Sequence, residues 1–179
     1  MEKLSDHDKA VLNCIFNPNL PIGEAEITNN VDIQDSEECT AKNLETKQME
    51  LEAIQLAEQG KLQEAIKLVN SAIDATPNRP SLYNNRAHIL QYLRQFDDAL
   101  NDLTTAISLC TDQHKKTLSQ AYTQRGILYK RNNKIELAKE DFENAARLGN
   151  KFAKSQLIEL NPYAALCNQM LKQVMDQLN

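Results

Sequence analysis

The sequence predicts an all-α fold: a right-handed superhelical solenoid of three helix-turn-helix repeats with a C-terminal capping extension. One observation behind this prediction is composition, because the 179 residues include only 4 Gly and 5 Pro, too few for the closely spaced turns of a β sandwich or barrel. The other is an internal repeat around Ala65, Ala99 and Ala138, which lie 34 and 39 residues apart. A repeat of this length is typical of stacked helical hairpins.

Each copy of the repeat contains the same pattern of large and small residues. A large residue is followed four positions later by a small one, three further by another large residue, and then by the anchor alanine. The copies contain Met49, Ala53, Leu56 and Ala65, then Tyr83, Ala87, Leu90 and Ala99, then Tyr122, Gly126, Tyr129 and Ala138. Small residues let antiparallel helices approach closely, and such hairpins bury their apolar stripes only by stacking on neighbours.

Turn-forming residues separate the two helices of each copy. Gly60 suits the left-handed conformation that ends a helix, and Asn133 is the next best residue at the equivalent place in the third copy. Residues 112–117 form an insertion that lengthens one connection. The expected organisation is a short N-terminal amphipathic helix and turn (1–20), an acidic flexible linker (21–45), three repeats (46–79, 80–113 and 119–150) and C-terminal capping helices (151–179).

Charge is distributed unevenly along the chain. The net charge is −5, but residues 1–45 carry three basic and ten acidic side chains, a net of −7, whereas the remainder carries +2. This pattern offers no basic surface to nucleic acid or to anionic lipid. No stretch approaches the roughly 20 apolar residues of a membrane-inserted helix, and the first residues lack the apolar core of a signal peptide. We therefore expect a cytoplasmic protein without nucleic-acid or membrane partners.

Residues that would indicate catalysis or metal binding are sparse. The four cysteines are 25, 71 and 57 residues apart, so no pair has the tight spacing of zinc ligands. The sequence contains no phosphate-binding loop, nucleophile elbow or metalloprotease motif. We expect no enzyme activity, no metal and no cofactor. The alternative, a cryptic enzyme, would need convergent polar groups that the sequence does not reveal.

Several segments resemble known proteins. LYNNRAHILQYLRQFDDALNDLTTAISL and AYTQRGILYKRNNKIELAKEDFENAARL resemble tetratricopeptide repeats, and a weaker copy precedes them. AVLNCIFNPNLPIGE at 10–24 and LNPYAALCNQMLKQVM at 160–175 extend the resemblance, over nearly the whole chain, to the tetratricopeptide repeat protein 36 family. That resemblance implies a scaffold that associates with Hsp70-type chaperones and stabilises a client enzyme, with 4-hydroxyphenylpyruvate dioxygenase and tyrosine catabolism as the implied link. The alternative that it implies is an adaptor in ciliary assembly or transport, with an association with the cilium.

A tetratricopeptide array binds partners on its concave face, which the first helix of each repeat lines. Counting from the anchor alanines, we expect the peptide groove to be lined by Leu51 and Ile54 from the first repeat, Asn84, Asn85, His88 and Tyr92 from the second, and Thr123, Gln124, Ile127, Lys130 and Arg131 from the third. Apolar side chains between amides suit an apolar helix or an extended neutral peptide.

Chaperone-binding members of this repeat class hold a peptide carboxylate with a clamp of lysine, asparagine and arginine side chains. The matching positions here are Glu50, Ile54, Asn85, Gln120 and Gln124, of which only Asn85 agrees. Three cations are missing and one acid is added, so we expect clamp-type binding of an acidic tail to be badly weakened. Association with a chaperone then requires another surface or another peptide.

A candidate occupant of the groove lies in the chain itself. Ser5 to Asp8 has the pattern of a helix cap, and apolar residues follow at helical spacing before Asn17 and Pro18 end the helix. A flexible linker of this length spans tens of ångströms. One hypothesis is that helix 5–16 docks in the groove or against the first repeat. The alternatives are packing elsewhere on the solenoid or ordering only on a partner.

Overall fold

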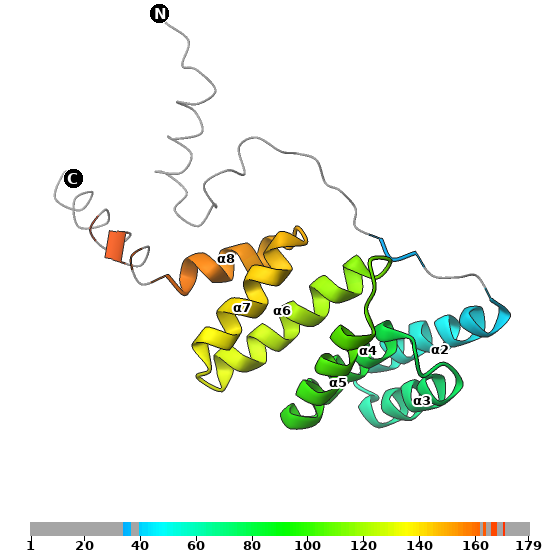
Figure 1. The fold of residues 1–179 in the computed structure, drawn as a ribbon. Helices are drawn as coiled ribbons and strands as arrows, with labels where there is room; N and C mark the ends of the chain where they lie inside the picture. The colour runs from blue at the N-terminus through cyan, green and yellow to red at the C-terminus, as the bar shows by residue number, and fades with distance from the viewer. Residues whose placement is uncertain (1–33, 37–39, 162, 164–165, 168–169, 171–179) are drawn as a thin grey trace, which may run out of the picture.

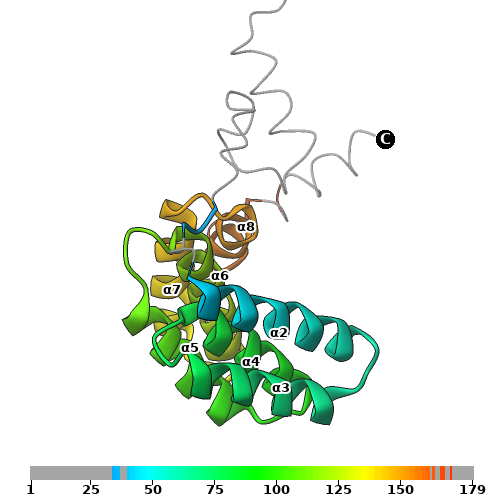
Figure 2. The same cartoon turned by 90° about the vertical axis from the view of Figure 1, so that its right-hand side faces the viewer.

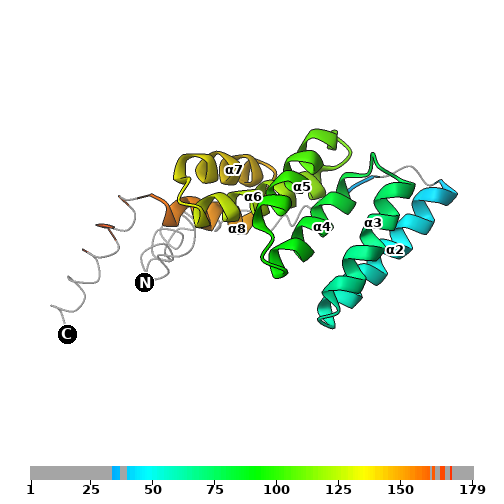
Figure 3. The same cartoon turned by 90° about the horizontal axis from the view of Figure 1, so that it is seen from below.

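The computed structural model describes residues 34–36, 40–161, 163, 166–167 and 170. Over these residues, helices with defined bounds are α2 (Ala41–Glu58), α3 (Leu62–Ala75), α4 (Pro80–Tyr92), α5 (Phe96–Leu109), α6 (Lys115–Arg131), α7 (Ile135–Arg147) and α8 (Lys151–Glu159). Figures 1 and 3 show three hairpins, α2–α3, α4–α5 and α6–α7, stacked in chain order, with α8 beside α7. The predicted all-α array of helical hairpins is confirmed.

Small residues at the repeated positions lie between the helices of each hairpin. The anchor alanines Ala65, Ala99 and Ala138 are fully buried. In the third hairpin a Cβ on Gly126 would lie 2.9 Å from the ring of Phe142, which is itself fully buried. Close packing at these positions therefore sets the distance between the paired helices.

A left-handed residue ends the first helix of each hairpin. Gly60, Arg94 and Asn133 have φ angles of +79°, +61° and +58°. In each case the next amide reaches back to the carbonyl five residues earlier, as Lys61 N does to Leu56 O at 2.9 Å, which is a Schellman ending. The roles of Gly60 and Asn133 follow the sequence prediction, whereas Arg94 adopts this backbone without a glycine or asparagine.

Two partly buried ion pairs join the helices of the second and third hairpins. Arg86 on α4 donates two hydrogen bonds to the carboxylate of Asp102 on α5, each 2.7 Å long. Arg125 on α6 contacts Asp141 on α7 in the same way at 2.8 Å. Hydrogen bonding to the carboxylate raises the pKa of each arginine above its ordinary value. These pairs fix the rotation of α4 and α6, and so determine which side chains point away from α5 and α7.

Two helices begin earlier than the sequence analysis expected. α2 begins at Ala41 rather than 46, because the Thr40 side chain accepts a hydrogen bond from Asn43 N at 3.2 Å and caps the helix. α6 begins at Lys115 rather than 119, so the end of the insertion is helical. The last residues of the expected linker, 41–45, are therefore part of the first hairpin.

The C-terminal part of the solenoid is covered by α8. Ala153 is fully buried, and Leu157 and Leu160 pack on the same cluster as Phe142. Beyond α8, the described side chains of Tyr163, Leu166 and Met170 are exposed, and most of the rest of the expected capping segment (151–179) lies outside the described residues. The expected N-terminal helix and turn (1–20) lie outside the described residues.

Candidate functional site

The first helices of the three hairpins form one continuous face, since α4 contacts both α2 and α6 (Figure 2). Two depressions lie on it. The polar depression has a volume of about 680 Å³ and is lined by Gln34, Asp35, Ser36, Lys47, Glu50, Leu51, Ile54, Arg79, Ser81, Asn84, Asn85, Lys116, Thr117 and Gln120. The aromatic depression has a volume of about 530 Å³ and is lined by His88, Gln91, Tyr92, Arg94, Phe96, Ile127, Leu128 and Arg131.

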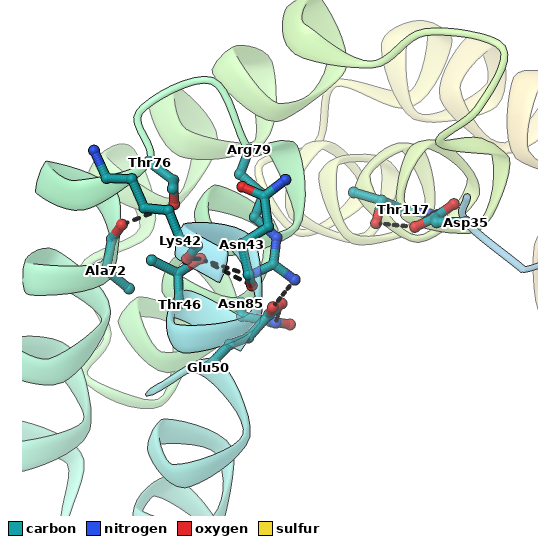
Figure 4. Close-up of polar contacts among 10 residues, drawn as sticks. All are labelled: Asp35, Lys42, Asn43, Thr46, Glu50, Ala72, Thr76, Arg79, Asn85 and Thr117. Atoms are coloured by element: carbon teal, nitrogen blue, oxygen red, sulfur yellow. Dashed lines mark hydrogen bonds and ion pairs between the residues drawn. The ribbon is translucent and has the colours of Figure 1, made fainter. Parts of the chain in front are cut away.

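A buried ion pair closes one side of the polar depression (Figure 4). Arg79, which immediately precedes α4, lies 2.7 Å from the carboxylate of Glu50 on α2, and the two side chains are 7% and 9% exposed. Asn85 on α4 also donates a hydrogen bond to Glu50, and Arg79 donates one to Thr46 at 3.3 Å. Glu50 therefore joins α2 to α4. It also occupies a hydrogen-bond donor of Asn85, the one residue that agrees with the clamp pattern.

Residues 34–36 form the opposite side of the polar depression. The Asp35 carboxylate accepts a hydrogen bond from Lys116 N at 2.8 Å. It also accepts hydrogen bonds from Thr117 N at 3.1 Å and from the Thr117 hydroxyl (Figure 4). Ser36 N donates to Gln113 O at 3.0 Å. Because His114, the residue before α6, makes no side-chain capping bond, Asp35 caps this helix from a distant part of the chain. This part of the expected flexible linker is therefore bound to the solenoid.

A chain of side-chain amides separates the two depressions. Asn84 Nδ2 donates to Gln120 Oε1 at 3.4 Å, Gln124 Nε2 donates to Asn84 Oδ1 at 2.9 Å, and Gln91 Nε2 donates to Gln124 Oε1 at 2.7 Å. Asn84 is buried within this network. The amides thus join α4 to α6, and each of the four side chains uses at least one hydrogen-bonding group inside the protein.

The aromatic depression exposes rings and an aliphatic side chain. Tyr92 is 62% exposed and Ile127 is 39% exposed. The rings of His88 and Tyr92 lie 5.1 Å apart at an angle of 40°. The guanidinium of Arg131 lies over the Phe96 ring, 3.4 Å from its centroid, an arrangement that holds both in place.

The residues predicted to line one groove are divided by the structure. Leu51, Ile54, Asn84 and Asn85 line the polar depression, and His88, Tyr92, Ile127 and Arg131 line the aromatic one. Gln124 lies in the amide network, while Thr123 lines neither depression and donates its hydroxyl to Ser119 O at 2.7 Å.

Lys130, the remaining predicted groove residue, contacts α8 instead. Its ammonium lies 2.9 Å from both Gln156 Oε1 and Glu159 Oε1. The hydrogen bond from Lys130 lowers the pKa of the Glu159 carboxyl below its usual range. This residue therefore holds the capping helix on α6.

Several lining residues were not predicted. Counting from the anchor alanines finds only residues on the first helices, so it omits Arg79 in the connection before α4, Arg94 in the turn after it and Phe96 at the start of α5. Asp35 lies in a segment without helical periodicity, and its bonds cross more than 80 positions of sequence. No local pattern indicates such a contact.

The polar depression offers groups for binding a peptide. The hydroxyl of Ser81 is buried and has no hydrogen-bond partner within the described part of the chain. Leu51 is 55% exposed beside it.

Across the described residues, no three His, Cys, Asp or Glu side chains are grouped as a metal would require. The same residues include no helix long and apolar enough to span a membrane.

Comparison with known sequences agrees with the hairpin array. The tetratricopeptide repeat model matches residues 80–113 and 119–149. The chain is 44% identical to the tetratricopeptide repeat protein 36 homolog of Drosophila melanogaster, over 98% of this chain and 96% of that one. It is 41% identical to tetratricopeptide repeat protein 36 of Danio rerio, over 97% and 94% of the two chains, and 39% identical to that of Homo sapiens, over 96% and 94%.

Two solved structures share the arrangement of helices. The first TPR of Spaghetti (RPAP3) bound to the HSP90 peptide SRMEEVD is 29% identical, with a TM-score of 0.58, and the match covers 67% of this chain and 93% of that one. The second TPR domain of human RPAP3 in complex with the HSP70 peptide SGPTIEEVD is 27% identical, with a TM-score of 0.57, and covers 66% and 97%. Because its sequence is similar to these relatives along nearly its whole length, this chain belongs to the tetratricopeptide repeat protein 36 family.

Proposed function

We propose that the chain is a non-enzymatic, cytoplasmic scaffold that associates with an Hsp70-type chaperone and stabilises a client enzyme. The observation that carries this proposal is the polar depression, which lies between the first helices of the three hairpins. It combines apolar side chains with the Ser81 hydroxyl, which has no hydrogen-bond partner among the described residues. Support comes from the two similar repeat domains, whose structures contain HSP90 and HSP70 peptides. Concave faces of helical solenoids are their usual binding surfaces.

The proposed mode of binding differs from capture of a peptide carboxylate. Such capture relies on cations and amides that are free to donate. Here Glu50 occupies one of the cation positions and accepts the hydrogen bond of Asn85, while Gln120 and Gln124 are neutral and belong to the amide network. We therefore assign partner binding to apolar contact with Leu51 and Ile54, supported by hydrogen bonds to the rim.

The identity of the client rests on the family resemblance alone. On the basis of this resemblance, we propose 4-hydroxyphenylpyruvate dioxygenase as the stabilised enzyme, which implies a role in tyrosine catabolism. The alternative role as an adaptor at the cilium rests on the same resemblance and would use the same groove. Proximity labelling in cells separates the two, because the first role predicts enrichment of the dioxygenase and the second predicts enrichment of ciliary proteins.

Two leucines on α2 provide a matched test of the groove. Leu51 lines the polar depression and Leu44 does not, yet both side chains are 55% exposed. In calorimetric titrations with an intact cytosolic Hsp70, we expect Leu51→Ser to weaken binding about tenfold, because burial of a leucine contributes about 1.5 kcal/mol or more. Leu44→Ser should bind as the unchanged protein does. Equal affinities of the two variants would contradict the assignment to this depression, and no binding by any form would contradict the chaperone proposal.

A further inference from the structure

We propose that residues 5–16 dock as a helix in the aromatic depression of their own chain. The proposal concerns the depression that the chaperone proposal does not use, and its test contains no chaperone. The two proposals can therefore fail separately.

The aromatic depression has the surface that an amphipathic helix requires. Tyr92 and Ile127 expose 62% and 39% of their surface there, on the adjacent helices α4 and α6. Helix-in-groove binding depends on such apolar side chains at helical spacing on both walls. Covering exposed groups of this kind with an apolar stripe is favourable, because it removes apolar surface from water.

The charges around the depression select the kind of helix that fits. Arg94 and Arg131 are its charged lining residues, and no Asp or Glu of the described part of the chain lines it. Arg131 is held over Phe96, so its guanidinium stays at the edge of the depression. A helix with an apolar stripe and carboxylates near one end would satisfy both features.

Residues 5–16 have that composition. Val11, Leu12, Ile15 and Phe16 recur at helical spacing within this segment, and Leu4 immediately precedes it. Asp6 and Asp8 lie in the first turn of the predicted helix, where carboxylates are favoured by the helix dipole and available to the two arginines. The acidic head and the weakly basic repeats of this chain have complementary charge.

The structure also brings the N-terminal part of the chain to the correct helix. The hydrogen bonds of Asp35 and Ser36 attach the chain to the start of α6, and Ile127 and Arg131 lie further along the same helix. From Thr117 to Ile127 the helix rises about 15 Å. Residues 17–33 separate the predicted helix from this attachment, and a flexible chain of that length has an end-to-end distance of about 23 Å. The connection therefore reaches the aromatic depression and keeps the local concentration of the helix high.

A nitroxide on Cys14 of the full-length chain tests the proposal. Cys39, Cys110 and Cys167 are changed to Ser, so that Cys14 is the one thiol left to carry the label. We expect the nitroxide to reduce the NMR intensities of Ile127 and Tyr92 at least twofold relative to Leu137 on α7. Leu12→Asp should restore those intensities without changing the circular dichroism spectrum.

Ile127 and Leu137 supply the matched substitutions, since they are 39% and 43% exposed and only Ile127 lines the aromatic depression. Ile127→Ser should abolish the broadening at Tyr92, and Leu137→Ser should leave it unchanged. Uniform intensities, or broadening centred on any other surface, would overturn the proposal. A mixture of nitroxide-labelled and isotope-labelled chains distinguishes a second copy as the occupant, and broadening in that mixture would also overturn docking within one chain.

Discussion

Asn85 donates a side-chain hydrogen bond to Glu50, which lies 35 residues earlier on the neighbouring hairpin. The acid at this position thus has two effects on the groove. It removes a cation that a carboxylate clamp needs, and it engages the amide that agrees with the clamp pattern. Arg79 balances the charge of Glu50 from the start of α4, so the corner is electrically paired within the protein.

The Glu50–Arg79 pair should matter for stability chiefly when it is broken. Glu50→Ala leaves the guanidinium of Arg79 buried without this carboxylate, and we expect the free energy of unfolding to fall by about 3 kcal/mol. In the double variant Glu50→Leu with Arg79→Met, neither charge remains, and the loss should be about 1 kcal/mol or less. Urea denaturation of the two variants measures this difference. A double variant as unstable as Glu50→Ala would contradict it.

Gly126 should not tolerate even a methyl group. A Cβ at this position would lie 2.9 Å from the ring of Phe142, which is fully buried. Alanine favours a helix over glycine by about 1 kcal/mol, but overpacking costs about 1–3 kcal/mol, so we expect Gly126→Ala to be destabilised by about 1 kcal/mol. Thermal denaturation tests the sign. Gly126→Ala combined with Phe142→Leu should recover part of the loss, and a stabilised single variant would show that the helices can separate freely.

The fold could be predicted from sequence because its determinants are local and repeated. The anchor alanines recur at offsets of 34 and 39 residues, so a comparison of the copies reveals them. The turn residues Gly60 and Asn133 can be recognised within their own copies. The array of hairpins follows from them. The starts of α2 and α6 were missed by a few residues, since Thr40 and Asp35 cap them outside the repeat pattern.

The site was predicted less completely. Helical spacing identifies which side chains project from one face of the first helices. It does not identify which of these side chains bind each other. Asn84 is buried among other amides, and Lys130 is held by Glu159 of α8. These partners come from different hairpins, so their pairing depends on how the hairpins stack and not on the pattern within one repeat.

Asp35 should stabilise the start of α6 through its capping hydrogen bonds. Replacing a capping side chain by alanine costs about 1 kcal/mol. We therefore expect Asp35→Ala to lower stability by about that amount and to accelerate hydrogen exchange at the amides of Lys116 and Thr117. Asp112→Ala, in the exposed loop before α6, is the control and should leave that exchange unchanged. Unchanged protection in Asp35→Ala would mean that the contact is not formed in solution.

Cys110 should be resistant to alkylation while the protein is folded. Burial raises the pKa of its thiol to about 12, so at pH 8 only about one molecule in ten thousand carries the thiolate. Iodoacetamide should modify the exposed Cys167 faster than the partly buried Cys110, and denaturation should remove the difference. Since folding raises this pKa, the folded state keeps the proton longer, and stability should fall as pH rises from about 9 towards 12. Rapid labelling of Cys110 at pH 8 would contradict its burial.

If the polar depression binds a partner without a carboxylate clamp, an intact chaperone should bind where its acidic tail alone does not. Calorimetric titration with the HSP70 peptide SGPTIEEVD, beside the intact chaperone, measures this difference. We expect binding of the intact chaperone and no measurable heat of binding with the peptide. Micromolar binding of the peptide, lost in Asn85→Ala, would show the opposite, because it would mean that Asn85 leaves Glu50 to hold a carboxylate.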